Sequence, residues 1–237
     1  MKFTTPLVRG RLVKRYKRFF ADVELADGTI VTAHCANSGS MKSVNEPGSD
    51  VWITPNDDPK RKLKFTWEMI RIGDAMVGIN TSRPNAIVEE AILAGAIPEL
   101  AGYETLRREV KYGKNSRIDI LLEDPNRPTC YVEVKNVTLK RDLTLGTPAE
   151  FPDGVTARGA KHLVEMTGMI AEGHRAAMVY LIQRDDANAV TMAEDLDPAY
   201  AETLRTALGK GVEALACGCA LNEQEIVVDR VAKVIAP

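Results

Sequence analysis

The hydrophobic pattern of this 237-residue chain changes near residue 80, and that change limits the folds the chain can adopt. Before it, short alternating segments are separated by turn residues, and no stretch has helical spacing. Beyond it, Pro84-Asn85 opens a helical pattern that Gly95 ends, and helices and strands then alternate. Because a single domain usually holds roughly 100 to 200 residues, we predict two domains, residues 1–80 and residues 81–237.

The first domain is predicted to be a small all-β barrel. The Asp27-Gly28 step between two alternating segments is typical of a β-hairpin turn. Five or six strands without a helix fit the five-stranded oligonucleotide-binding (OB) barrel best, and an SH3-like barrel is the alternative. The expected strands are residues 7–13, 19–25, 30–35, 50–53, 63–72 and 76–79.

The second domain is predicted to be an α/β domain, with a mixed sheet flanked by helices. Its expected strands lie near residues 109–112, 118–122, 130–137, 176–183 and 226–235. Besides the first helix, we expect one across residues 158–172 and one or two across residues 198–216. A loop rich in Gly and Pro, residues 140–157, precedes the second of these helices.

The composition excludes several classes of protein. With 45% hydrophobic and 27% charged residues, the chain resembles an average soluble globular protein. No stretch approaches the ~20 apolar residues that span a bilayer, and the N-terminal residues lack the apolar segment of a secretory signal, so we expect a cytoplasmic protein without a membrane partner. The four cysteines form no CxxC pair, so neither a disulfide framework nor a zinc site is expected. We also expect no nucleotide cofactor.

The net charge of −2 conceals an asymmetry between the two halves. Residues 1–80 carry 13 Lys and Arg against 9 Asp and Glu, whereas residues 81–237 carry 18 against 24. The halves therefore face different partners, and the basic half is the one suited to a polyanion.

Two acidic side chains are predicted to face each other in a β-hairpin of the second domain. Alternating segments lie on both sides of a turn centred on Asn126, and this register places Asp119 opposite Glu133. The period of two puts Lys135 on the same face. The register also pairs apolar with apolar residues, Ile118 with Val134 and Ile120 with Val132.

This arrangement requires a compensating cation, because like charges directly opposite each other destabilise a sheet. Mg²⁺ or Mn²⁺ suits two carboxylates, since such ions take one or two carboxylates plus water and phosphate oxygens. Lys135 would orient or deprotonate an attacking water, or stabilise charge on a phosphate. The set thus predicts phosphodiester hydrolysis. The alternative is a solvated hairpin face on which Lys135 neutralises the acids.

Basic residues in three segments predict a nucleic-acid partner. Cations beside an aromatic ring, which can stack on a base, suit an OB-type groove, so salt-sensitive binding is expected. A solvated loop is the alternative for the first cluster, and a plain surface helix for the third. The predicted nucleic-acid-binding residues are Arg9, Arg11, Lys14, Arg15, Tyr16, Lys17 and Arg18; Lys60, Arg61, Lys62 and Lys64; and, with His162 beside them, Arg158 and Lys161.

Eight short motifs occur in order along the chain: Arg15-Tyr-Lys-Arg-Phe, Asn37-Ser-Gly-Ser-Met, Pro59-Lys-Arg-Lys-Leu, Val77-Gly-Ile-Asn-Thr, Arg108-Glu-Val-Lys-Tyr-Gly, Asn115-Ser-Arg-Ile-Asp, Tyr131-Val-Glu-Val-Lys-Asn-Val-Thr and Lys161-His-Leu. Together they resemble the sugar fermentation stimulation protein A family. The resemblance implies an OB-like first domain, a second domain similar to PD-(D/E)xK nucleases, and DNA binding without strong sequence preference. It also implies a link to regulation of sugar, especially maltose, utilisation.

The resemblance places the nuclease-like motif on Asp119, Glu133 and Lys135, and implies a helical glutamate that completes the set. Helical periodicity does not choose between Glu89 and Glu90, and Glu90 is preferred because its surroundings resemble the family pattern. We therefore predict a magnesium-dependent nuclease acting on DNA. The alternatives are a non-catalytic DNA-binding regulator of sugar utilisation and an RNA-binding role; the oligomeric state is left open.

Overall fold

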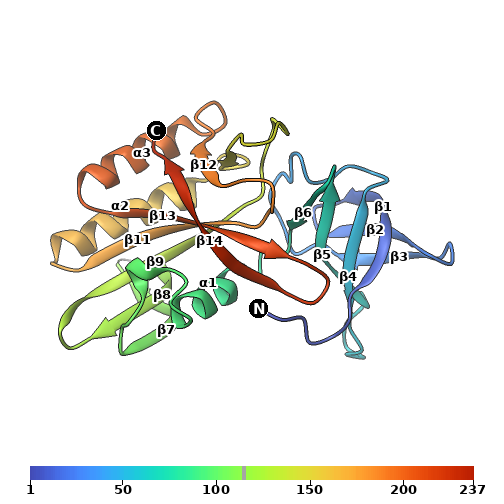
Figure 1. Ribbon diagram of the computed structural model, residues 1–237, viewed down its shortest axis with the longest axis horizontal. Helices are drawn as coiled ribbons and strands as arrows, with labels where there is room; N and C mark the ends of the chain where they lie inside the picture. Colours follow the sequence, from blue (N-terminus) through green and yellow to red (C-terminus); the bar gives the residue numbers. More distant parts are fainter. Residues whose placement is uncertain (114–115) are drawn as a thin grey trace.

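The computed structural model describes residues 1–113 and 116–237. Lys114 and Asn115 lie outside the described residues, and with them the first residue of the motif Asn115-Ser-Arg-Ile-Asp. The described chain forms two units, a barrel and a larger sheet covered by helices, which lie side by side (Figure 1).

The first unit is an OB-like barrel, as predicted. β1 pairs with both β2 and β4, and β3 pairs in parallel with β5, so that five strands close on themselves. This Greek-key closure is that of the OB fold rather than of an SH3-like barrel. The strands are β1 (Val8–Tyr16), β2 (Phe20–Leu25), β3 (Ile30–His34), β4 (Asp50–Pro55), β5 (Phe65–Ile72) and the appended β6 (Ala75–Gly78).

The second unit is a mixed sheet with the strand order β10-β12-β14-β13-β11-β9-β8-β7. β11 runs parallel to both neighbours, β9 and β13, whereas the hairpins β7–β8, β8–β9 and β13–β14 are antiparallel. The strands are β7 (Thr105–Tyr112), β8 (Ser116–Asp124), β9 (Arg127–Val137), β10 (Ala149–Phe151), β11 (Arg175–Ile182), β12 (Ala189–Met192), β13 (Glu213–Leu221) and β14 (Ile226–Ile235). The helices are α1 (Pro84–Leu93), α2 (Ala157–Ala171) and α3 (Pro198–Gly209), with a short 3-10 turn at Pro98–Leu100.

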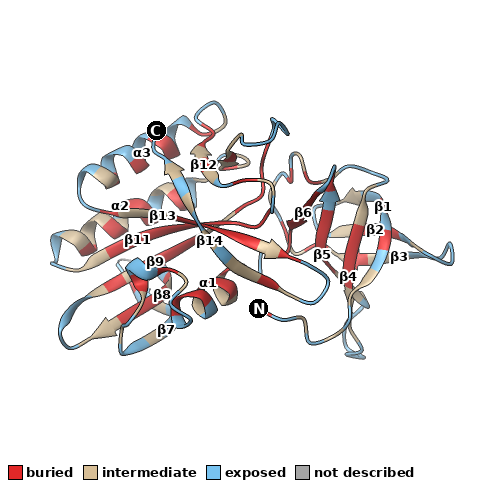
Figure 2. Cartoon of the chain, in the orientation of Figure 1, coloured by how far each residue is buried: buried red, intermediate tan, exposed pale blue. Residues whose placement is uncertain are grey.

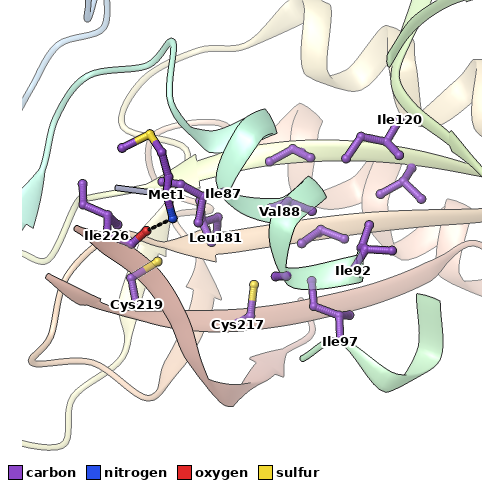
Figure 3. Packing of buried hydrophobic residues seen from close by; sticks show 14 of the residues in the cluster. Met1, Ile87, Val88, Ile92, Ile97, Ile120, Leu181, Cys217, Cys219 and Ile226 are labelled. Atoms are coloured by element: carbon purple, nitrogen blue, oxygen red, sulfur yellow. Dashed lines mark hydrogen bonds between the residues drawn. The ribbon is translucent and has the colours of Figure 1, made fainter. Parts of the chain in front are cut away.

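Helices cover both faces of this sheet, which explains why β11 is apolar and buried from Ala176 to Ile182 (Figure 2). Val179 and Leu181 pack in the cluster that contains α1, shown in Figure 3. Met178 and Tyr180 point the other way, into the cluster formed by α2 and α3. The period of two in one strand thereby builds two cores.

Several parts of the structure differ from the sequence-based expectation: β10 lies within the expected loop of residues 140–157, and the pattern does not predict β12. Helix α3 ends at Gly209. Residues 213–216, which the sequence pattern predicts to be helical, instead form the first part of β13, residues 213–221. Alanine, cysteine and glycine dominate this strand, so its sequence carries no β-branched signal. The first residues also leave the barrel, because Lys2 pairs with Glu225 beside the β13–β14 turn. No helix among the described residues is long and apolar enough to cross a membrane.

Buried charges hold the segments where the two units meet. Glu68 of β5 is 1% exposed and receives hydrogen bonds from Arg83 at 2.7 and 3.1 Å. Lys140 and Arg184 are fully buried and both contact Asp186. Burial favours the neutral form of Asp186, but the two cations outweigh it and lower the pKa of its carboxyl.

Candidate active site

The β8–β9 hairpin has the register predicted from the sequence. Ile120 pairs with Val132 and Leu121 with Tyr131, so the same register continued by one residue sets Asp119 against Glu133. The ladder opens at that point, and Oδ2 of Asp119 instead accepts the backbone N–H of Val134 at 2.8 Å. The Asp119 carboxylate therefore lies between the two strands.

The other oxygen of Asp119 is held from helix α1. Asn85, in the first turn of α1, donates its Nδ2 to Oδ1 of Asp119 at 2.9 Å. Burial raises the pKa of Asp119, and the negative charge of Glu133 raises it further. This is the electrostatic cost that facing acids are expected to carry, and it favours a cation at the site.

Glu133 is 3% exposed, and its two carboxylate oxygens have different surroundings. Oε1 accepts from Nζ of Lys135 at 2.7 Å and lies 2.5 Å from Nδ1 of His162. Oε2 is buried and has no hydrogen-bond partner among the described residues. Burial acts to raise the pKa of Glu133, but His162 and Lys135 outweigh it, and the pKa is lowered.

His162 is a site residue whose role the sequence does not reveal. The sequence predicts it near a nucleic-acid backbone, but it is 3% exposed and contacts Glu133. Its Nε2 accepts a hydrogen bond from Nε of Arg158 at 3.4 Å. Arg158 and Lys161, on the same helix, are exposed, and Lys161 lies 3.7 Å from Glu165. A histidine in the second turn of a helix gives no signal that it faces a strand glutamate.

The structure does not bring Glu90 into contact with the acid pair. Its carboxylate lies 2.6 Å from the Met1 nitrogen and is 58% exposed. Glu89 contacts Arg108 at 3.3 Å, and Asn85 contacts Asp119. At about 100° per residue, Glu89 lies only about 40° from Asn85 around the helix, whereas Glu90 lies about 140° away. The helix face that meets the acid pair is therefore that of Asn85 and Glu89.

Two further polar residues of β7 lie beside the acid pair, and sequence reasoning missed both. The register of β7 and β8 places Glu109 across from Asp119. Oε1 of Glu109 lies 3.5 Å from Nδ2 of Asn85. Its φ of 55° distorts the strand there. Burial raises the pKa of the Tyr112 phenol, and the nearby carboxylates, Glu133 first, raise it further, so its hydroxyl remains a donor.

The donor set fits a hard divalent ion with few protein ligands. Within residues 1–113 and 116–237, no three His, Cys, Asp or Glu side chains lie close enough together to enclose an ion by themselves. Mg²⁺ does not require such a cage, because it keeps several waters and takes one or two carboxylates. The buried, unpartnered Oε2 of Glu133 is the atom that such an ion would satisfy.

The basic residues of the barrel fall into two groups. Nη2 of Arg15 donates to the carbonyls of Asn37 and Gly39, at 2.9 and 3.0 Å, so this guanidinium holds a loop. The rest are exposed, except the half-buried ring of Tyr16, which stacks on Phe20. Among the exposed cations, Arg9 pairs with Asp50 and Lys14 lies near Asp22. Exposed without such an ion pair in the described structure are Arg11, Lys17 and Arg18 on β1 and the β1–β2 turn, and Lys60, Arg61, Lys62 and Lys64 before β5.

The loop that Arg15 holds connects the barrel to the second unit. Ser40 and the backbone of Met41 donate to Asp153, which precedes α2. A cavity of about 110 Å³ lies at this junction. It is lined by residues of both units, among them Asn37 and Asn136, and Asn136 directly follows Lys135 on β9. Asn37, from the loop held by Arg15, and Asn136, next to Lys135, therefore line the same cavity.

Fold and site together define a two-domain protein, in which an OB-like barrel is joined to an α/β domain with two acids and a lysine on neighbouring strands. The chain belongs to the SfsA family. Residues 13–79 match the model "SfsA N-terminal OB domain", and residues 82–225 match "Sugar fermentation stimulation protein RE domain". This confirms the family resemblance seen in the sequence motifs.

Relatives match over the whole chain. The sugar fermentation stimulation protein homolog of Rhodospirillum rubrum is 64% identical, and that of Rhodospirillum centenum 58%, each with 100% of both chains covered. Among solved structures, Pyrococcus furiosus SfsA in complex with Ca²⁺ superimposes with a TM-score of 0.85 at 26% identity, covering 99% of this chain and 97% of the other. The two-domain architecture is therefore shared along its full length.

Proposed function

We propose that this protein is a divalent-ion-dependent nuclease that hydrolyses phosphodiester bonds in DNA with little sequence preference. The observation that carries the proposal is the state of Glu133, whose Oε2 is buried and unpartnered while Oε1 has two donors. A buried polar atom without a partner costs about 1–3 kcal/mol, so native proteins rarely keep one without a ligand or an ordered water. The charge of Glu133 also acts on Asp119 and raises the pKa of its carboxyl, so the two acids lie near each other.

Asp119 and Glu133 are the residues that would hold the ion. Both supply carboxylate oxygen, the donor that hard cations prefer. The P. furiosus relative was solved in complex with Ca²⁺, another hard cation with oxygen ligands, which supports an ion of this type in the family. A bound Mg²⁺ or Mn²⁺ would polarise a phosphoryl oxygen and lower the pKa of a coordinated water.

The chain's own residues would supply position and charge. Asn85 and the Val134 N–H hold both oxygens of Asp119, so its carboxylate cannot rotate freely. The ammonium of Lys135 is anchored on Glu133, and its side chain is 15% exposed. From there it can stabilise negative charge on the phosphate or orient the attacking water. This preorganisation is what a solvated hairpin face would lack.

The barrel would supply affinity for the nucleic acid. Lys17 and Arg18 form the β1–β2 turn, with φ of 47° and 65°, and Phe19 beside them is 45% exposed. Exposed cations next to an exposed ring can contact phosphates and stack on a base. Through the loop held by Arg15, this turn is connected to the segment before α2. A bound DNA strand would then run from the β1–β2 turn toward β9.

The experiment is a cleavage assay on labelled single- and double-stranded DNA and RNA with Mg²⁺, Mn²⁺ or a chelator. We expect ion-dependent DNA cleavage by the wild type, loss of cleavage in Asp119→Asn and Lys135→Ala, and no loss in Lys111→Ala. Lys111 is an exposed lysine on neighbouring β7 and serves as the matched control. DNA binding without cleavage under every condition would instead favour the non-catalytic regulator of sugar utilisation. Cleavage of RNA alone would identify RNA, and not DNA, as the substrate.

A further inference from the structure

The carboxylate of Glu133 is held from one side only. Lys135, on the same strand, and His162, from α2, both contact Oε1, and no hydrogen-bond donor in the described chain reaches the buried Oε2. A carboxylate fixed at one oxygen by two groups from different elements cannot rotate without breaking both contacts. The direction of the free oxygen is therefore set by its two partners.

The hydrogen bonds of His162 define which nitrogen carries the proton. Arg158 has only donors, so its contact with Nε2 at 3.4 Å requires an unprotonated Nε2. The proton must then sit on Nδ1, which donates to Oε1 of Glu133. A donor on Nδ1 fixes Oε1 of Glu133 and thereby orients the carboxylate.

Helix α2 places this imidazole rigidly. The hydroxyl of Thr156 accepts the backbone N–H of Gly159 at 3.2 Å, and Asp197 before α3 accepts the backbone N–H of Thr156 at 2.7 Å. A Cβ on Gly159 would lie 3.1 Å from the ring of Tyr200, so α2 and α3 pack closely there. The first turns of α2, and with them His162, are fixed to the start of α3.

From these contacts we infer that His162 is a positioning residue: its Nδ1–H turns Glu133 so that Oε2 faces the divalent ion. The inference rests on the proposed function, since it assumes an ion at the acid pair. A histidine that merely fills a core would need its hydrogen bonds satisfied but would not control ion affinity. Partners that orient metal ligands typically account for about 10–100-fold in metal affinity or activity.

The test replaces His162 by asparagine or by glutamine, whose side-chain amides each imitate one of the two ring nitrogens. The amide nitrogen of His162→Asn falls near the position of Nδ1 and can still donate to Glu133, whereas that of His162→Gln falls near Nε2. We expect His162→Asn to bind Mn²⁺ within about 3-fold of wild type and His162→Gln to bind about 10–100-fold more weakly, by titration calorimetry on the full chain. Equal affinity in the two variants, or weakening in both alike, overturns the inference.

A second measurement needs no variant. The ¹⁵N shifts of the His162 ring at neutral pH should show the proton on Nδ1, and a proton on Nε2 alone would overturn the inference. Calorimetry also separates this inference from the proposed function. If the wild type binds Mn²⁺ and cleaves DNA while His162→Gln binds as tightly, only the positioning role fails. If the wild type binds no ion, both fail together.

Discussion

The substitution Asp119→Asn should stabilise the fold when no divalent ion is present and destabilise it, relative to the wild type, when an ion is bound. Without an ion, the substitution removes a half-buried charge that is repelled by Glu133. Because Oδ2 accepts from Val134, asparagine can keep its oxygen there, and Asn85 can turn its own amide to accept from the new amide group. Relief of an opposed like-charge pair is worth up to about 1 kcal/mol, or about 2–4 °C in a protein of this size.

The sign of the pH dependence follows from the raised pKa of Asp119. A group whose pKa is raised in the folded state favours folding at low pH, and this contribution is lost as pH rises through the folded pKa. The advantage of Asp119→Asn should therefore be present at neutral pH and disappear in acid. With an ion at about 100 times its dissociation constant, the wild type should gain about 2.7 kcal/mol, and the variant should gain little.

The assay is thermal unfolding of both proteins with a chelator and with Mn²⁺, at neutral pH and near pH 3. Glu123→Gln is the control, because it removes the same charge from the same strand at a surface pair with Arg107. The variant should melt higher than wild type with chelator and lower with Mn²⁺. A wild type that Mn²⁺ does not stabilise, or a variant that Mn²⁺ stabilises equally, would refute the reasoning.

Three more predictions concern the rest of the molecule. Lys17→Ala with Arg18→Ala should weaken DNA binding and reduce the slope of log affinity against log salt by about 1.8, since each lost phosphate contact removes about 0.9. Arg83→Met should destabilise the chain by about 3 kcal/mol in urea unfolding, because it leaves buried Glu68 without its cation. Asp186 has a lowered pKa, so its ionised form stabilises the fold above about pH 4 and less as pH falls through its folded pKa; Asp186→Asn should remove that part of the acid sensitivity.

Each of these has an outcome that contradicts it. An unchanged salt slope in the double variant, with Lys210→Ala and Lys233→Ala as exposed controls outside the barrel, would remove the β1–β2 turn from DNA binding. Unaltered urea stability of Arg83→Met would show that Glu68 is satisfied by its neutral partners alone. A wild-type acid transition in Asp186→Asn would assign that transition to other carboxylates.

Sequence patterns are sufficient to predict a strand and its register wherever one face of the strand is buried. The turn around Asn126 and the apolar alternation determine the β8–β9 register, so the facing of Asp119 and Glu133 can be predicted from the sequence alone. The barrel strands are likewise predictable from alternation and turn residues. β13 is not, because it is covered on both faces and built from small residues that have no strong β-propensity.

The site residues that sequence reasoning misses depend on tertiary packing. Helical periodicity identifies the buried face of α1, but only the crossing of α1 over β8 shows that Asn85 and Glu89 face Asp119, while Glu90 points to Met1. His162 lies 29 residues from Glu133 along the chain, and the parallel crossover through α2 brings them together. No local pattern encodes such a contact.

The most direct test of the central claim is a crystal of the wild-type chain soaked in Mn²⁺ and measured at a wavelength where manganese scatters anomalously. The account predicts a peak about 2.0–2.3 Å from Oε2 of Glu133, with Asp119 as the second carboxylate of the site. No anomalous peak at the acid pair at saturating Mn²⁺, or a peak that leaves Oε2 of Glu133 without a ligand, would contradict it.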